Sequence, residues 1–195
     1  MSYEWDIFLS YPRLGDAGQW VENHFHPRLK ECLTNELAQP PRIFLDREQP
    51  TGVEWPENLK QALLQSRIMV AVWTPPYFAS RWCMAEWTSM LEREIVLDKR
   101  GRKPARGLVF PVIYSDGKHF DPRAKQIQIN FDFTEYNHPF KHFDSTPLYI
   151  DFNKLVKDLA ISIDEHLTLA PEWEDGWPAL EPPAVQTQSL ELPRL

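Results

Sequence analysis

Ile68-Met69-Val70-Ala71-Val72-Trp73 is a run of six consecutive apolar residues that stops at Thr74-Pro75-Pro76. A short continuous apolar run bounded by prolines is typical of a buried strand, because a half-exposed strand alternates apolar and polar residues. Strands that are apolar on both faces occur mainly in parallel sheets covered by helices on both sides. The run therefore predicts the central strand of such a sheet.

Segments with the composition of strands lie on both sides of this run. We expect strands at residues 5–11, 42–45, 108–114 and, in shorter form, near 128–133. Apolar residues at helical spacing predict helices over about 20–37 with a kink at Pro27, 56–66, 82–97 and 148–167. This alternation predicts an α/β fold with an open parallel β-sheet and helices on both faces. Ligands bind such sheets beyond the carboxyl ends of the strands.

The composition changes near residue 170. Five prolines follow in the last 25 residues, together with acidic side chains and no apolar periodicity. We expect residues 1–168 to form one domain. Residues 169–195 are expected to be a mostly disordered, proline-rich acidic tail, or a linker.

Charge and hydropathy restrict the partners. The net charge of −7 argues against nucleic acid, because binding phosphates requires a basic surface. No apolar stretch reaches the ~20 residues of a membrane span, so no membrane partner is expected. The acidic N-terminus lacks the pattern of a signal peptide, and Cys32 and Cys83 lie in apolar segments that suit buried free thiols. These features predict a cytoplasmic protein.

The segment Ser80-Arg81-Trp82-Cys83-Met84-Ala85-Glu86-Trp87 carries the clearest chemical signal. Ser80 can cap a helix, and the i, i+4 spacing of Trp82 and Glu86 places the indole and the carboxylate on one helical face. An aromatic plate beside a lone carboxylate suits a flat, positively charged ligand. The alternative is that Trp82 packs in the core and Glu86 is a solvated helix residue.

These elements resemble the TIR (Toll/interleukin-1 receptor) domain family, and specifically its bacterial NAD-cleaving branch, over about residues 4–167. The matches in chain order are Phe8-Leu9-Ser10-Tyr11, Asp16, Asp46, Gly52, Ser66, Tyr77, Ser80, Trp82, Cys83 and Glu86. The chain departs from the family pattern at Pro12-Arg13 and in the long segment 115–147, and neither departure removes a required group.

The resemblance implies a flavodoxin-like fold and cleavage of the nicotinamide–ribose bond of NAD+, with Glu86 as catalytic residue and Trp82 lining the pocket. NAD+ is then the substrate, and no cofactor or metal is implied. One carboxylate suffices because nicotinamide leaves as a neutral molecule and needs no general acid, unlike the leaving group of ordinary glycosidases. An ionised Glu can stabilise the oxocarbenium-like ribose. Hydrolysis to ADP-ribose and cyclisation to a cyclic ADP-ribose isomer both stay open.

Further substrate contacts are expected from Ser10, Tyr11, Arg13, Asp46 and Tyr77. Arg13 either binds the diphosphate through its guanidinium fork or is an ordinary surface residue. Asp46, at the end of a strand, either contacts the ligand or caps backbone donors of its own loop.

By resemblance, such domains act as effectors in antiphage or cell-suicide defence and become active when they assemble. The loop 46–56, with Arg47, Pro50, Gly52 and Trp55, is the expected contact to a neighbouring TIR unit, and the tail is expected to serve an activating partner or a fused domain. The alternative function is a non-catalytic adaptor that signals by TIR–TIR contact. Glu86 favours the enzyme, because adaptor TIR domains commonly lack that residue.

Overall fold

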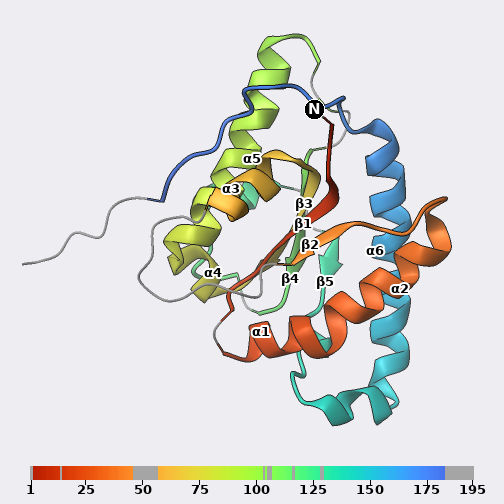
Figure 1. The fold of residues 1–195 in the computed structure, drawn as a ribbon. Coiled ribbons are helices and arrows are strands. Elements are labelled where there is room, and N and C mark those ends of the chain that lie inside the picture. Colours follow the sequence, from red (N-terminus) through yellow and green to blue (C-terminus); the bar gives the residue numbers. More distant parts are fainter. Residues whose placement is uncertain are drawn as a thin grey trace, which may run out of the picture.

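The computed structural model describes residues 2–13, 15–45, 57–102, 104, 107–115, 117–127 and 130–182. Within these residues a parallel sheet with strand order β2-β1-β3-β4-β5 forms the centre of the molecule (Figure 1). The strands are β1 Trp5–Ser10, β2 Ile43–Leu45, β3 Ser66–Trp73, β4 Val109–Ile113 and β5 Phe131–Asp132. This order is that of the flavodoxin-like doubly wound sheet, so the predicted α/β class is confirmed.

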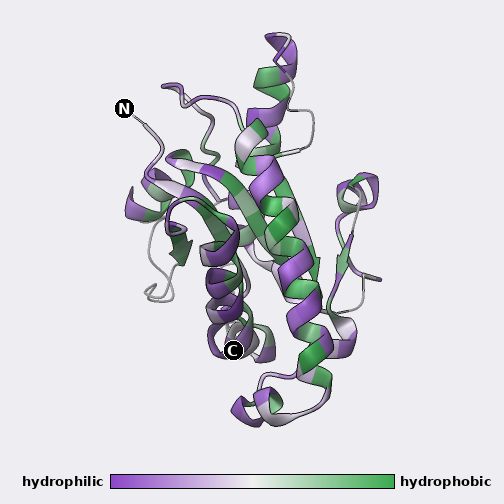
Figure 2. Cartoon of the chain, turned by 90° about the vertical axis from the view of Figure 1, so that its right-hand side faces the viewer, coloured by the Kyte–Doolittle hydropathy of each residue, from purple (hydrophilic) through white to green (hydrophobic). Residues whose placement is uncertain are grey.

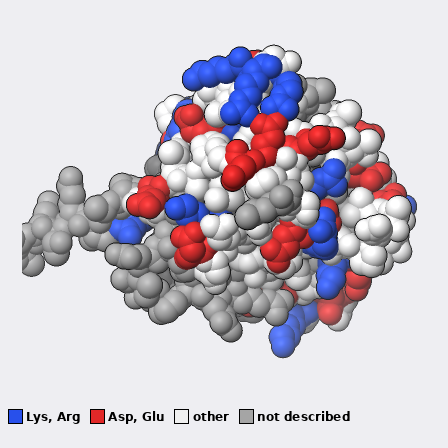
Figure 3. All heavy atoms as spheres, turned by 45° about the horizontal axis from the view of Figure 1, so that its top comes forward, with Lys and Arg blue, Asp and Glu red and all other residues white. Residues whose placement is uncertain are grey.

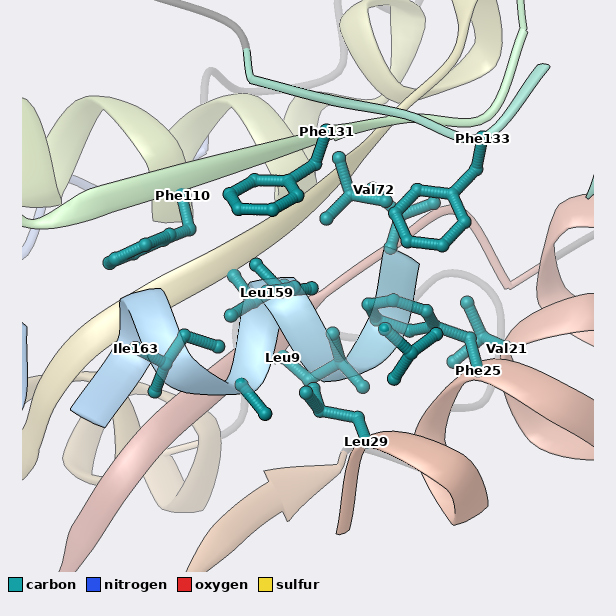
Figure 4. Packing of buried hydrophobic residues seen from close by; sticks show 14 of the residues in the cluster. Leu9, Val21, Phe25, Leu29, Val72, Phe110, Phe131, Phe133, Leu159 and Ile163 are labelled. Atoms are coloured by element: carbon teal, nitrogen blue, oxygen red, sulfur yellow. The ribbon is translucent and has the colours of Figure 1, made fainter. Parts of the chain in front are cut away.

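One face of the sheet is covered by α2 (His26–Glu36) and α6 (Leu148–Leu169), with α1 (Asp16–Trp20) leading toward α2. Leu9 of β1 points to this face and packs among side chains from the helices and β4 (Figure 4). Ile7 belongs to the same cluster. Hydrophilic and hydrophobic residues alternate in bands along the helices, as expected when one side of a helix packs on a sheet (Figure 2). None of the described helices is both long and apolar enough to cross a membrane.

The other face is covered by α3 (Glu57–Leu64), α4 (Pro75–Ala79) and α5 (Arg81–Lys99). Phe8 and Trp73 point to this face, in alternation with their neighbours, because successive side chains of a strand face opposite sides. Trp73, Phe78 and Trp87 meet edge to face in this layer. The 3-10 turns Pro122–Gln126, Thr134–Tyr136 and Lys141–Ser145 occur between β4 and α6.

The irregularity predicted at Pro27 takes the form of a π-helical turn, Val21–Phe25, immediately before α2. Proline has no backbone N–H and its ring crowds the carbonyl four residues earlier, so the α-helical ladder cannot continue regularly there. A wider turn accommodates this break without ending the helical path.

Two predictions for the segment around β3 are wrong in detail. Ser66 is the first residue of β3 and not the end of the preceding helix; its hydroxyl donates to the Ala62 carbonyl at 2.7 Å. Residues 75–79, for which no helix or strand was predicted, form α4. Pro75 and Pro76 occupy its first turn, where a missing N–H costs nothing, and the Thr74 hydroxyl accepts from the Tyr77 N–H at 3.0 Å.

The described part of the C-terminal extension, residues 170–182, packs against α5 and is not disordered there. Trp177 is 6% exposed and lies on Arg93, whose guanidinium carbon is 5.2 Å from the ring centroid. Fully buried Arg93 donates to the carbonyls of Ser66 at 2.8 Å and Leu63 at 3.0 Å. The domain boundary after residue 168 stays a prediction, and residues 183–195 lie outside the described residues.

Two basic side chains directly after α5 are paired with the same extension. Arg100 and Arg102 both form ion pairs with Glu174. Figure 3 shows Lys and Arg side chains gathered beside acidic ones on this side of the molecule. The extension is therefore attached to α5 by charge as well as by the packing of Trp177.

Replacing Trp177 by Ala is expected to lower the free energy of unfolding by about 3 kcal/mol, because it removes a buried aromatic ring and the cover of Arg93. Leu180→Ala is the matched control in the same segment: its side chain is 40% exposed and its backbone N–H still bonds to Ser89. Denaturant unfolding of both variants measures the difference. Equal losses would show that residues 170–182 contribute no specific packing.

Candidate active site

Three side chains meet where the parallel strands end. Ser10 is the last residue of β1, Tyr77 lies on α4 directly after β3, and Glu86 lies on α5. This is the carboxyl edge of the sheet, where the fold class places its ligands.

Helix caps fix the two helices that supply Tyr77 and Glu86. Thr74 caps α4, and the Ser80 hydroxyl accepts from the Cys83 N–H at 3.3 Å at the start of α5. Because α4 has only five residues and Ser80 follows it directly, the two caps define where Tyr77 and Glu86 enter the site.

The three side chains are joined by hydrogen bonds. The Ser10 hydroxyl donates to Oε2 of Glu86 at 2.6 Å, and the Ser10 and Tyr77 hydroxyl oxygens are 3.1 Å apart. Among the described residues, Oε1 of Glu86 takes no hydrogen bond. The carboxylate is thus held at one oxygen only.

Burial dominates the electrostatics of the site. Glu86 is 6% exposed, and burial raises the pKa of its carboxyl from 4.5 to about 7, against the opposing effects of the Ser10 hydrogen bond and the Arg13 charge. Burial also raises the pKa of Tyr77 and Cys83, and the Glu86 charge adds to the rise in both. An ionised carboxylate at this position therefore lowers the stability of the folded state, which is typical of functional positions.

Arg13 reaches the site from the loop after β1. Burial lowers the pKa of its guanidinium and the charge of Glu86 opposes this effect, which places the two groups within electrostatic reach. A Cβ on Gly18 would lie 2.2 Å from the Arg13 carbonyl oxygen, so only glycine permits this path of the loop.

The structure separates the predicted site residues into three groups. Ser10, Tyr77 and Glu86 are in direct contact, with Arg13 beside them. Trp82 is half-buried against the same core layer, and the Arg81 guanidinium lies 5.6 Å from its ring centroid. The loop residues Asp46, Arg47, Pro50, Gly52 and Trp55 lie outside the described residues.

Tyr11 is not one of the three hydrogen-bonded residues, although its charge acts on the Arg13 guanidinium. It is 5% exposed and packs in the core on the opposite face of the sheet, because it has the parity of Ile7 and Leu9 along the chain and Ser10 has the other. Its part in binding substrate stays a prediction that this placement does not favour.

Cys83 is a buried neighbour of Glu86 that the sequence analysis did not include among the site residues. The two are spaced i, i+3 on α5, which puts them on one face, and the charge of Glu86 helps to raise the thiol pKa. The spacing alone was a sufficient signal. Trp87 is fully buried in the core.

No group of three or more His, Cys, Asp or Glu among the described residues could hold a metal ion. A cavity of about 550 Å³ lies away from Glu86, between β4, β5 and α6, with Phe110, Phe131 and His166 in its wall.

Comparison with known proteins gives a family. The family model for the TIR domain matches residues 7–146, which include Ser10, Tyr77 and Glu86. The TIR domain of the Toll-related receptor TRR-2 from Hydra magnipapillata is 15% identical over 77% of this chain and 98% of its own, with a TM-score of 0.48. The TIR domains of the activated Roq1 resistosome are 23% identical over 83% and 84%, with a TM-score of 0.39. Curated proteins gave no match.

Glu86→Gln is expected to stabilise the protein at high pH. The raised pKa means that the folded state disfavours the ionised carboxyl, so this cost is absent well below pH 4.5, grows with pH and is complete above about pH 7. Removing the charge while keeping an oxygen for Ser10 should add about 3 kcal/mol to the free energy of unfolding at pH 8 and under ~1 kcal/mol at pH 4. Denaturant unfolding at both pH values tests this, and a gain independent of pH would contradict it.

Proposed function

The chain belongs to the TIR domain family, and we propose that it cleaves the nicotinamide–ribose bond of NAD+ with Glu86 as the catalytic carboxylate. The observation that carries the proposal is the half-satisfied state of Glu86, whose Oε2 is held by Ser10 while Oε1 takes no bond among the described residues. A carboxylate fixed in this way can present its second oxygen to a ligand. Its place at the carboxyl edge of the sheet fits a binding site.

The reaction breaks the bond between the ribose C1′ and the nicotinamide ring nitrogen. The electron pair of that bond goes to the nitrogen, so nicotinamide leaves neutral and positive charge remains on the ribose. An ionised Glu86 stabilises this charge, and does so strongly because the site is buried. A water oxygen then bonds to C1′ to give ADP-ribose, or an adenine nitrogen does so to give a cyclic isomer. One proton is released in either route.

Arg13 and Trp82 support the same substrate. In this proposal the Arg13 guanidinium, whose charge already acts on Glu86, binds the diphosphate through its fork of N–H donors. Trp82, one helical turn before Glu86, stacks on the nicotinamide or ribose side.

We further propose that the activity depends on assembly with other copies of the chain and serves antiphage defence in the cytoplasm. This part rests on family resemblance. The expected contact loop, residues 46–56, lies outside the described residues, and the Roq1 TIR domains were seen in an activated resistosome. A partner bound through the C-terminal extension belongs to the same proposal.

Wild-type protein is expected to release nicotinamide from NAD+. The rate of Glu86→Gln is expected to be at least ~100-fold lower, which is the usual loss when one electrostatic contact to the transition state is removed. Glu92→Gln, a half-buried carboxylate further along α5, is the control and should keep the wild-type rate. Chromatography of the products, with and without a crowding agent, measures both. If the assembled wild type leaves NAD+ intact, the chain is better described as a non-catalytic TIR–TIR module.

The rate should also depend on pH in a defined direction. Because the ionised carboxylate is the active form, kcat/KM is expected to fall about tenfold per unit below an apparent pKa of about 7 and to level off above it. Initial rates between pH 5 and 9 give this profile. A rate that stays level down to pH 5 would mean that Glu86 ionises at its ordinary pKa.

A further inference from the structure

Ser10 has a single hydroxyl hydrogen, and its use fixes the direction of two hydrogen bonds. At 2.6 Å from Oε2 of Glu86, the Ser10 hydroxyl donates to the carboxylate. The second contact of the same oxygen, 3.1 Å from the Tyr77 hydroxyl, must then be donated by Tyr77. The three groups form one directed chain from Tyr77 through Ser10 to Glu86.

We propose that Ser10 and Tyr77 are positioning residues that hold the ionised Glu86 carboxylate through this chain and leave only Oε1 for substrate. The proposal concerns the same site as the proposed function and rests on it for its catalytic part. It replaces the role of substrate contact that the sequence suggested for the two residues.

Their burial argues against direct contact with substrate. Ser10 is 1% exposed and Tyr77 fully buried. The only hydrogen of each hydroxyl is already donated within the chain, so neither has a donor left for a ligand. A ligand could reach them only by breaking the bonds that hold Glu86.

The chain also joins three elements that the rest of the fold keeps rigid. Ser10 ends β1, which pairs with β2 and β3, and Tyr77 is buried on the capped α4. Glu86 lies on the 19-residue helix α5. Because each anchor is fixed by its own element, the orientation of the carboxylate is set before any ligand binds.

The charged and titratable groups that face Glu86 determine what the loss of Ser10 would do. Arg13 faces it from the loop after β1, Tyr77 from α4 and Cys83 from its own helix. Arg13 and the Ser10 hydroxyl favour the ionised form, whereas burial opposes it. Without the Ser10 hydroxyl, only Arg13 opposes the effect of burial on the pKa of Glu86. The carboxyl should therefore stay protonated up to a higher pH.

The first test needs no substrate. A titration of the Glu86 side-chain carboxyl by 13C NMR, with its resonance identified by loss in Glu86→Gln, should give a midpoint about one pH unit higher in Ser10→Ala than in wild type. Ser10→Thr keeps the hydroxyl and should restore the wild-type midpoint. Tyr77→Phe removes one oxygen atom and should raise the midpoint by less, because Ser10 still donates directly. An unchanged midpoint in Ser10→Ala overturns the proposal.

The second test separates positioning from substrate contact. The acid limb of kcat/KM should move to higher pH in Ser10→Ala by the same amount as the NMR midpoint. At pH 9, where Glu86 is ionised in both proteins, KM should equal that of wild type while kcat stays lower, because the carboxylate has lost its anchor. A raised KM at every pH with an unmoved limb would identify Ser10 as a substrate contact instead. If wild type cleaves no NAD+, the proposed function fails, and the NMR titration still decides whether the chain holds Glu86.

Discussion

A carboxylate that is removed from water has to find its hydrogen bonds inside the protein, and in this domain Glu86 finds one of them at Ser10. That single contact ties the end of β1 to the middle of the layer formed by α4 and α5. For this contact to form, the side chain of Ser10 must face the α5 layer. Because side chains alternate along a strand, Phe8 then faces the same layer and Ile7 and Leu9 face the other one. The caps on α4 and α5 and the glycine beneath Arg13 all hold groups around this contact.

Helix α5 buries a second ionisable group, and the contrast is informative. Arg93 gives hydrogen bonds to two carbonyls and is covered by Trp177, although its Nε has no partner in the described structure. Burial lowers the pKa of this guanidinium to about 10, so it stays charged at neutral pH. Arg93 joins α3, β3 and the C-terminal extension and is a structural group. Glu86, held at one oxygen and about half ionised at pH 7, has the properties expected of a functional side chain.

Much of the sheet could be predicted from the sequence, because each strand is a short apolar run and the observed limits of β1, β2 and β4 fall within one residue of the expected ones. Helix α4 was missed because Pro75-Pro76 fits both the end of a strand and the first turn of a helix. The contact between Ser10 and Glu86 spans 76 residues, and only the family resemblance brought both to one site. The motif also contains Tyr11, which packs with Ile7 and Leu9 on the other face of the sheet, and its contact with substrate stays a prediction.

Residues 170–182 run along α5, so the last described residues lie beside this helix and not at the end of α6. Helix α6 ends at Leu169, yet at Leu180 the backbone is bonded to Ser89, three residues from Glu86 on the same helix. That offset is only ~4.5 Å of helix rise. A force applied to the chain at this point would therefore act on the helix that carries the carboxylate. The packing of Trp177 and the ion pairs of Glu174 would oppose detachment of the extension. Residues 170–182 therefore connect the last described residues directly to the helix that carries Glu86.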